Sequence, residues 1–257
     1  MTSTPEPETV TRTTKGERTK ARILDASLEL FMDLGFEKTT MRKVAERAGV
    51  SVGNAYYYFE SKEHLVQGFY GRSDEDHHAA CAPILATETS FKKRLEKVLE
   101  AKLDTSEPYH HFSGLLFKTA ADPASPLNPF SAESQPVRDH SVALMREVVE
   151  GSDIKVHKDL ADDLPDLLWL YMMGVILFWI HDTSTGRART RRLVAHTTGL
   201  VTQLIRLSGL PLMGPLRRRA KRLLVDLRAA PDEEAAAGAS DGGNSGAVDT
   251  TSGPDER

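Results

Sequence analysis

Hydrophobic positions along this chain recur every three to four residues, the spacing of helices that bury one face. In residues 15–34 they form one broad face that Gly35 ends, and Thr14 with Glu17 has the form of a capping box at its start. We find neither an internal repeat nor the alternation of β-strands. The pattern predicts an all-α protein.

Two short helices follow, each with its own start and stop signals. Thr40 can cap a helix with apolar residues at positions 41, 44, 45 and 48, and Gly49 can end it because glycine adopts the left-handed backbone without a clash. Ser51 can cap a second helix over Val52–Tyr58. Together with the helix before them, they predict a three-helix module over residues 15–62.

The second short helix turns an unusual face outward. Ala55 and Phe59, four residues apart, would face the interior. The outer face would then carry Val52, Gly53, Asn54, Tyr56 and Tyr57. Helix-turn-helix proteins insert such a helix into the major groove of DNA and read base edges with its first residues. The module is therefore interpreted as a DNA-binding head.

The rest of the chain predicts a larger helical body over residues 63–228. A connecting helix would run from His64 to about Ala82, where Pro83 would end it. Further helices are expected at about 90–105, 109–121, 135–150, 161–181, 187–207 and 212–228, with a proline-rich loop over 122–129. Residues 1–14 would form a disordered leader and 229–257 a disordered acidic tail.

Charge is unevenly distributed along the chain. The net charge is −4, but residues 229–257 contribute −6, so residues 1–228 sum to +2. Five basic residues against Glu17 give +4 over residues 12–22, where the first helix begins. This cluster is either a solvated arm or a contact to backbone phosphates. The net charge therefore does not argue against DNA binding.

Two features bear on the compartment. The single cysteine, Cys81, cannot form an intrachain disulfide, which fits a reducing cytoplasm. Leu167–Ile180 is an uncharged run too short for a membrane span of about 20 residues, and charged residues close both of its ends. We expect a buried helix there, no membrane association and a cytoplasmic location.

The head also resembles a known family. The match runs without a gap through Ile23–Phe31, Gly35-Phe36, Thr39–Met41, Val44–Ser51, Asn54–Phe59 and Ser61–Leu65. In these segments the chain resembles the TetR family of bacterial repressors, whereas the rest is similar only in its helical character and length. The resemblance implies a homodimer that binds a palindromic double-stranded DNA operator and is released by a small-molecule effector.

Carried over by position, the resemblance implies DNA contacts in and around the second short helix. Val52, Gly53 and Asn54 would lie nearest the bases. Because Val52 and Gly53 offer no side-chain hydrogen bonds, base recognition would rest on thymine methyl groups, Asn54 and Arg42. Phosphates and sugars would be contacted by Thr40, Arg42, Tyr56, Tyr57, Tyr58 and Lys62. The candidate set also includes Arg18, from the basic cluster, and Ser51, the cap of the second short helix. Without the motif, the tyrosines would be core residues and Lys62 a solvated lysine.

The last two long helices have a second interpretation. In the resembling family they pair with their copies in a four-helix bundle, so we expect the homodimer to form through residues near 161–181 and 187–207. Two heads held about one helical turn apart on DNA require such a connection. The alternative is that these apolar residues serve only an intramolecular core.

An effector pocket is expected among the aromatic and methionine residues of the body. The candidate lining residues are His111, Phe112, Phe117, Trp169, Met173, Phe178 and His181. Such side chains line pockets for apolar ligands, and they also build cores. The polar handles do not decide between an acyl chain, an aromatic metabolite and a drug.

Other chemistries are weakly supported. The segment Asp74-Glu-Asp-His77-His78 contains potential metal ligands, but its spacing matches no known helical metal motif, and solvent exposure is expected. No metal, no cofactor and no catalytic residue are predicted, because the chain lacks a phosphate loop, a Gly-x-Ser-x-Gly motif and a cysteine–histidine pair. The sequence favours a ligand-responsive transcriptional regulator, most simply a repressor, over a helical binding protein without DNA recognition and over an enzyme.

Overall fold

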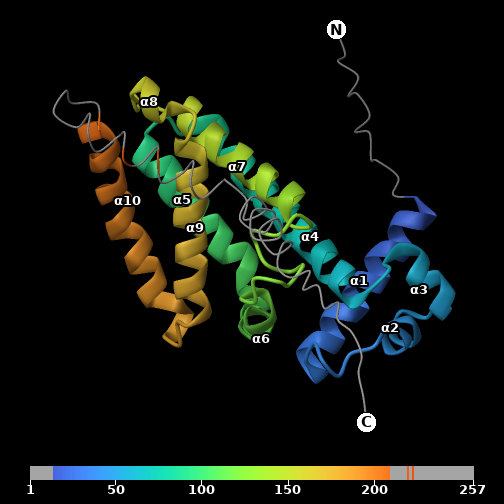
Figure 1. Ribbon diagram of the computed structural model, residues 1–257. Helices are drawn as coiled ribbons and strands as arrows, with labels where there is room; N and C mark the ends of the chain where they lie inside the picture. Colours follow the sequence, from blue (N-terminus) through green and yellow to red (C-terminus); the bar gives the residue numbers. More distant parts are fainter. Residues whose placement is uncertain (1–13, 209–218, 220–221, 223–257) are drawn as a thin grey trace, which may run out of the picture. The chain divides into compact units, whose positions relative to one another are not determined.

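The computed structural model describes residues 14–208, together with Arg219 and Arg222. Every regular element in this part is a helix, which confirms the all-α prediction. The elements are α1 (Lys15–Leu34), α2 (Met41–Ala48), α3 (Val52–Tyr58), α4 (Lys62–Thr87), α5 (Phe91–Ser106), η1 (Glu107–Tyr109), α6 (His110–Ala120), α7 (Gln135–Glu150), α8 (Lys158–Ala161), α9 (Leu164–Ile180), η2 (Thr185–Arg187) and α10 (Ala188–Ser208) (Figure 1).

Helices α1–α3 form the head, and the caps predicted for them are present. The Thr14 amide donates to Glu17 Oε2 (2.6 Å) and the Glu17 amide donates to Thr14 Oγ1 (3.2 Å), which completes the capping box. Gly49 ends α2 in the left-handed conformation with φ 64°. The Ser51 hydroxyl accepts from the Asn54 amide at the start of α3. Local signals therefore fix the starts of all three helices and the ends of α1 and α2.

The apolar core of the head reaches beyond the head itself. Its buried side chains come mainly from α1, α2 and the first turns of α4, with Ala55 and Phe59 from α3 and its end. Phe112 of α6 stacks on Phe31 of α1, with ring centroids 5.6 Å apart, and Leu127 of the α6–α7 loop is also buried here. The head is thus packed against α6 and the loop that follows it.

Helices α4–α10 form the body, which has a second apolar core. Helix α5 packs on α4, α7 and α10, while α7 packs on α9 (Figure 1). Arg94 of α5 is buried and donates to four backbone carbonyls, those of Leu85, Glu88, Glu147 and Val148. These carbonyls belong to the C-terminal ends of α4 and α7, where a cation is favoured by the helix dipole.

The structure corrects the predicted end of α4. The helix does not stop at Pro83 but continues to Thr87, with Pro83 inside it. Ile84 and Leu85 pack against the body core, and the Thr87 hydroxyl donates to the Pro83 carbonyl. This packing outweighs the one backbone hydrogen bond that a proline cannot donate.

The other body helices lie close to their predicted positions. Helices α5, α7, α9 and α10 match within a few residues, whereas α8 was not predicted. The expected helix over 212–228, the leader over 1–14 and the tail over 229–257 lie outside the described residues, apart from Thr14, Arg219 and Arg222. No helix in the described part is both long and apolar enough to cross a lipid bilayer.

Candidate nucleic-acid interface and ligand cavity

Helix α3 has one buried face and one open face. Ala55 is fully buried and Phe59, at the C-cap, packs into the head core. On the open side, Tyr57 is 81% exposed and Tyr56 about half exposed, while Val52 is also exposed. Tyr58 lies between these two groups, packed against the core with its ring edge-on to Tyr57. The two outer tyrosines therefore do not serve as core residues.

The first turn of α3 is accessible. Ser51 and Gly53 are exposed, and Asn54 is partly exposed. A side chain at position 53 would meet no other atom within 4 Å, so the surface in front of Gly53 is open. A partner could approach the backbone there closely.

Basic residues around α3 differ in how they are held. Arg47 donates to Glu29 at 2.9 Å and is neutralised by this pair. Arg18 and Arg42 are exposed and make no ion pair with another described residue. Thr40 caps α2 beside Arg42. These two guanidinium groups remain available to an anionic partner.

Lys62 has an intramolecular position that the sequence did not indicate. Its ammonium donates to the Phe36 carbonyl (3.0 Å) and lies 4.4 Å from the centroid of the Phe36 ring. The side chain is partly exposed at the N-terminus of α4. Lys62 thus ties α4 to the α1–α2 loop, with its charge placed at the edge of the head.

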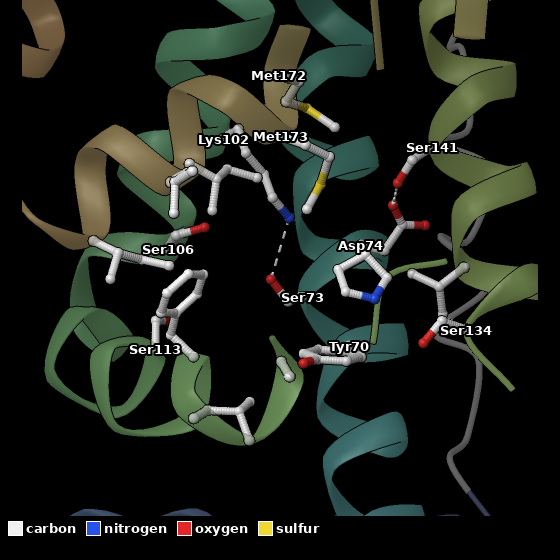
Figure 2. Close-up of a pocket in the computed structure, with 18 of the residues that line it drawn as sticks. Tyr70, Ser73, Asp74, Lys102, Ser106, Ser113, Ser134, Ser141, Met172 and Met173 are labelled. Atoms are coloured by element: carbon white, nitrogen blue, oxygen red, sulfur yellow. Dashed lines mark hydrogen bonds between the residues drawn. The ribbon is translucent and has the colours of Figure 1, made fainter. Parts of the chain in front are cut away.

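The body contains a cavity of about 230 Å³ between α4, α5, α6, α7 and α9. Most of its wall is apolar, with Phe69, Leu116, Trp169, Met172 and Met173 among the lining residues. Figure 2 shows a polar group on the α4 and α5 side, where the Lys102 ammonium points toward Ser73. Further polar side chains on the wall are Tyr70, Asp74, Ser106, Ser113, Ser134, Arg138 and Ser141.

Burial sets the ionisation of groups on and beside this wall. Burial lowers the pKa of Lys102, although the nearby Asp74 carboxylate opposes the shift. Burial also lowers the pKa of His77 to about 4, and its Nε2 lies 2.9 Å from the Val98 carbonyl. His77 is therefore neutral near pH 7.

Comparison with known proteins decides the family. A model described as the C-terminal domain of tetracyclin repressor-like proteins matches residues 94–222, and one described as bacterial regulatory proteins of the tetR family matches residues 23–68. The chain belongs to the TetR family. The first match covers half of the chain and includes the cavity-lining helices α6, α7 and α9.

Individual relatives of this TetR-family chain resemble it mainly in the head. The HTH-type transcriptional repressor KstR of Mycolicibacterium smegmatis is 52% identical over 59 residues, 23% of this chain and 28% of the relative. The chain thus spans about a quarter of the first curated relatives that it matches. The HTH-type transcriptional regulator SrpR of Pseudomonas putida is 27% identical over 149 residues, 57% of this chain and 68% of the relative.

Solved structures share the fold at low sequence identity. A tetR-family transcriptional regulator from Streptomyces coelicolor has a TM-score of 0.57 at 18% identity, covering 79% of this chain and 88% of that one. FadR from Bacillus subtilis, solved in complex with stearoyl-CoA, has a TM-score of 0.54 at 13% identity, covering 69% and 96%. The TetR-family fold therefore extends through the body, where sequence similarity fades.

Of the residues predicted to contact an effector in this TetR-family body, some line the cavity and others do not. Phe117, Trp169 and Met173 lie on its wall. Phe112 does not, because its helical phase turns it into the head core against Phe31. The remaining predictions, His111, Phe178 and His181, are exposed and do not line the cavity.

The polar wall of the TetR-family cavity was missed from the sequence. Its members come from four helices, so no local spacing connects them. The expectation of solvent exposure for residues 74–78 was wrong for Asp74 and His77, both of which are buried. No local sequence signal marks these two residues, because they are buried by the packing of α4 between α5 and α7, and a central helix buries more than one face.

Proposed function

We propose that this chain is a DNA-binding transcriptional repressor whose operator affinity is controlled by a small molecule. The observation that carries the proposal is α3, a capped helix with a closed inner face and with Tyr56 and Tyr57 held outward. In helix-turn-helix proteins such a helix enters the major groove. The exposed guanidinium groups of Arg18 and Arg42 support contacts to phosphates.

The chemistry of the exposed groups suggests which residues would contact bases and which would contact the DNA backbone. Val52, Gly53 and Asn54 at the N-terminal end of α3 would face base edges, with Asn54 able to form hydrogen bonds and Val52 to contact a thymine methyl group. Contacts to phosphates and sugars would come from Arg18, Thr40, Arg42, Ser51, Tyr56, Tyr57, Tyr58 and Lys62. Phosphate contacts by Lys62 would compete with its hydrogen bond to Phe36.

The homodimer proposal rests on an apolar surface of α9 and α10. Leu177 and Phe178 of α9 are exposed, and so are Leu200, Leu204 and Leu207 of α10, with Leu204 62% exposed. Leucines at positions 200, 204 and 207 share one face of α10 by helical spacing. Burying this face against a second copy would hold two heads for a palindromic operator.

The effector proposal rests on the cavity. Its apolar wall and its few convergent polar groups are the pattern of small-molecule sites. Helix α4 contributes Phe69 and Tyr70 to the cavity wall, and Phe69 also belongs to the head core. A ligand that prefers one position of α4 would therefore change the affinity for DNA, by roughly 5- to 150-fold for a typical coupling.

Fluorescence anisotropy with the DNA upstream of the protein's own gene tests DNA binding. Tyr57→Ala and Lys62→Ala should weaken binding to all sequences, and Asn54→Ala should also change the preferred bases. Lys93→Ala, which removes an exposed lysine of α5, is the matched control and should bind normally. Equal affinity of the wild-type protein for this fragment and for random DNA at physiological salt would contradict the proposal.

Analytical ultracentrifugation tests the dimer. Leu204→Glu should give monomers, whereas Leu115→Glu, an exposed leucine of α6, should leave the dimer intact. A wild-type protein that stays monomeric across micromolar concentrations would contradict the homodimer proposal.

Ligands found by thermal-shift screening test effector control. A ligand belongs to the cavity if Met173→Trp blocks its binding. If such a ligand leaves operator affinity unchanged, the proposed coupling between cavity and DNA binding is wrong.

A further inference from the structure

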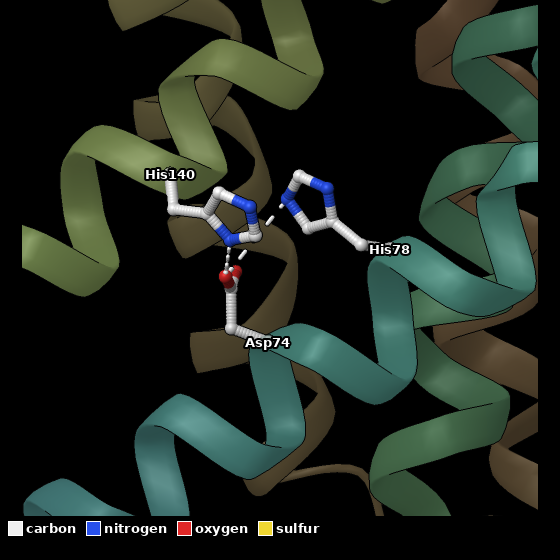
Figure 3. Close-up of side chains that lie close together, drawn as sticks. All are labelled: Asp74, His78 and His140. Atoms are coloured by element: carbon white, nitrogen blue, oxygen red, sulfur yellow. Dashed lines mark hydrogen bonds and ion pairs between the residues drawn. The ribbon is translucent and has the colours of Figure 1, made fainter. Parts of the chain in front are cut away.

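Three potential metal ligands converge where α4 meets α7. Asp74 and His78 of α4 and His140 of α7 each present one ligand atom, and these atoms lie within 4.8 Å of one another. His140 Nδ1 is hydrogen-bonded to Asp74 Oδ2, and His78 Nε2 lies 3.8 Å from the same oxygen. Figure 3 shows both imidazoles pointing to the Asp74 carboxylate from neighbouring helices.

The packing of α4 against α7 brings these three side chains together. Asp74 and His78 are four residues apart, so they share one face of α4. Helix α7 packs on α4 and brings His140 over that face, where its ring stacks on His78 with centroids 3.7 Å apart. The positions are set by backbone packing of two long helices rather than by a loop.

The Asp74 carboxylate is held in a fixed orientation. It is buried, and the Ser141 hydroxyl donates to its Oδ1 at 2.5 Å. This bond leaves Oδ2 turned toward the two imidazoles. Outer hydrogen bonds of this kind orient the ligands of known metal sites.

We propose that Asp74, His78 and His140 bind a divalent first-row transition-metal ion such as Zn²⁺ or Ni²⁺. Two imidazole nitrogens and one carboxylate oxygen suit ions of borderline softness, while Mg²⁺ and Ca²⁺ prefer oxygen alone. Three protein ligands leave a further position for water or another small ligand. The proposal does not rest on the proposed function, since the site requires neither DNA nor effector, although Asp74 also lies on the cavity wall.

The distances are close to those that an ion needs. With metal–ligand bonds of about 2.0–2.2 Å, ligand atoms of a tetrahedral site lie roughly 3.3–3.6 Å apart. The distance between Asp74 Oδ2 and His78 Nε2, 3.8 Å, is slightly longer than this ligand–ligand separation. The ion would take the place of the proton between His140 and Asp74, with that pair moving apart.

Access to the site comes from His140. Its side chain is 51% exposed, so its ring can turn out of the stack with His78 and direct Nδ1 to the ion. The His78 Nε2 atom is buried and makes no hydrogen bond in the described structure, so its coordination would break none. Glu147 adds negative charge near His78, which favours a cation there.

Isothermal titration of the untagged, chelator-treated full-length protein with ZnCl₂ and with NiCl₂ tests the site. We expect one ion per chain and a loss of affinity of at least about 10-fold in His78→Ala and in His140→Ala. His111→Ala, which removes another exposed histidine, should bind like the wild type. Absence of saturable binding, or equal losses in all three variants, would overturn the proposal.

A thermal readout separates coordination from folding defects. The ion would connect α4 to α7, so excess Zn²⁺ should raise the melting temperature of the wild type and of His111→Ala. In His140→Ala the Zn²⁺-dependent rise should be clearly smaller, whatever the melting temperature without metal. A Zn²⁺-dependent rise of equal size in His140→Ala would contradict the assignment of His140 as a ligand.

Discussion

The head and the body place their polar side chains in opposite ways. In the head, caps and tyrosines lie at the surface, and the buried hydroxyls of Ser27 and Thr39 bond to carbonyls of α1. In the body, Arg94, Asp182 and Asp74 are buried, and each meets several partners. The head is therefore held by apolar packing and local caps, while the body also depends on charged groups inside it.

This difference has a thermodynamic consequence. A buried charged group that loses its partner costs far more than an exposed one, because it can no longer be solvated. Single polar substitutions should therefore unfold the body more readily than the head. The head should respond chiefly to lost apolar contacts and to altered backbone conformations.

The largest effect is expected at Arg94 of the body. Arg94→Ala removes one donor from each of four carbonyls and should lower the free energy of unfolding by about 4 kcal/mol. Urea unfolding followed by the fluorescence of Trp169 and Trp179, both in α9, measures it. Arg146→Ala, an exposed arginine of α7, is the control, and a similar loss in both variants would refute the role of Arg94.

A somewhat smaller effect is expected where the two regions meet. Leu127 is fully buried in the head core although it belongs to a loop of the body, and the Tyr70 hydroxyl donates to its carbonyl. Leu127→Ala should cost about 3 kcal/mol through the cavity it creates. Leu115→Ala, at an exposed leucine, should cost little.

The same variant shows whether head and body unfold together. In the wild type we expect tryptophan fluorescence, which reports α9, and circular dichroism, which reports all helices, to give one transition. In Leu127→Ala the transition followed by tryptophan fluorescence and the one followed by circular dichroism should have different midpoints. Coincident transitions in Leu127→Ala would show that other contacts, such as Phe31 on Phe112, suffice to join the regions.

The structure of the head could be predicted from the sequence better than that of the body. The boundaries of α2 and α3 could be predicted because Thr40, Gly49 and Ser51 act on their immediate neighbours. The cluster of Asp74 with His140 could not, because its members are 66 residues apart and only the packing of α4 on α7 brings them together. Pro83 was misjudged for a related reason, since tertiary packing overrides its local preference.

The cavity shows the limit for the candidate ligand site. Its aromatic side could be partly predicted, since Phe117, Trp169 and Met173 stand out in composition. Helical phase then decides which of the neighbouring aromatic residues face inward, and a shift of one position moves a side chain by 100°, as for Phe178 beside the buried Trp179. The outer face of α3 needed the same decision, and there the inward spacing of Ala55 and Phe59 gave the correct phase.

An intermediate effect is expected at Asp182, which accepts four hydrogen bonds from Ser184 and Thr190 at the start of α10. Burial alone would raise the pKa of Asp182, but these hydrogen bonds hold it well below its usual range. Asp182→Asn removes the charge and should cost about 2 kcal/mol at pH 7.

The pH dependence gives this prediction its sign. A depressed pKa stabilises the folded state above the unfolded value of about 3.9, and the contribution is lost as pH falls toward the folded value. The difference between wild type and Asp182→Asn should therefore be constant from pH 7 to 5 and shrink below about pH 4. Urea midpoints across this range measure it, and a difference that grows toward low pH would contradict the assignment.

The smallest effect is expected in the head, at the turn between α2 and α3. Gly49 has φ 64°, where a Cβ is strained even though nothing lies within 4 Å of it, so Gly49→Ala should cost about 1 kcal/mol. Gly53, inside α3, also has open space, but its helical backbone suits alanine, so Gly53→Ala should stabilise by about 0.5 kcal/mol. Melting followed by circular dichroism compares the pair. If Gly49→Ala lowers stability and Gly53→Ala raises it, backbone conformation alone governs these two positions. If both variants are less stable than the wild type, contacts beyond the two glycines matter. The head would then depend on specific contacts as the body does.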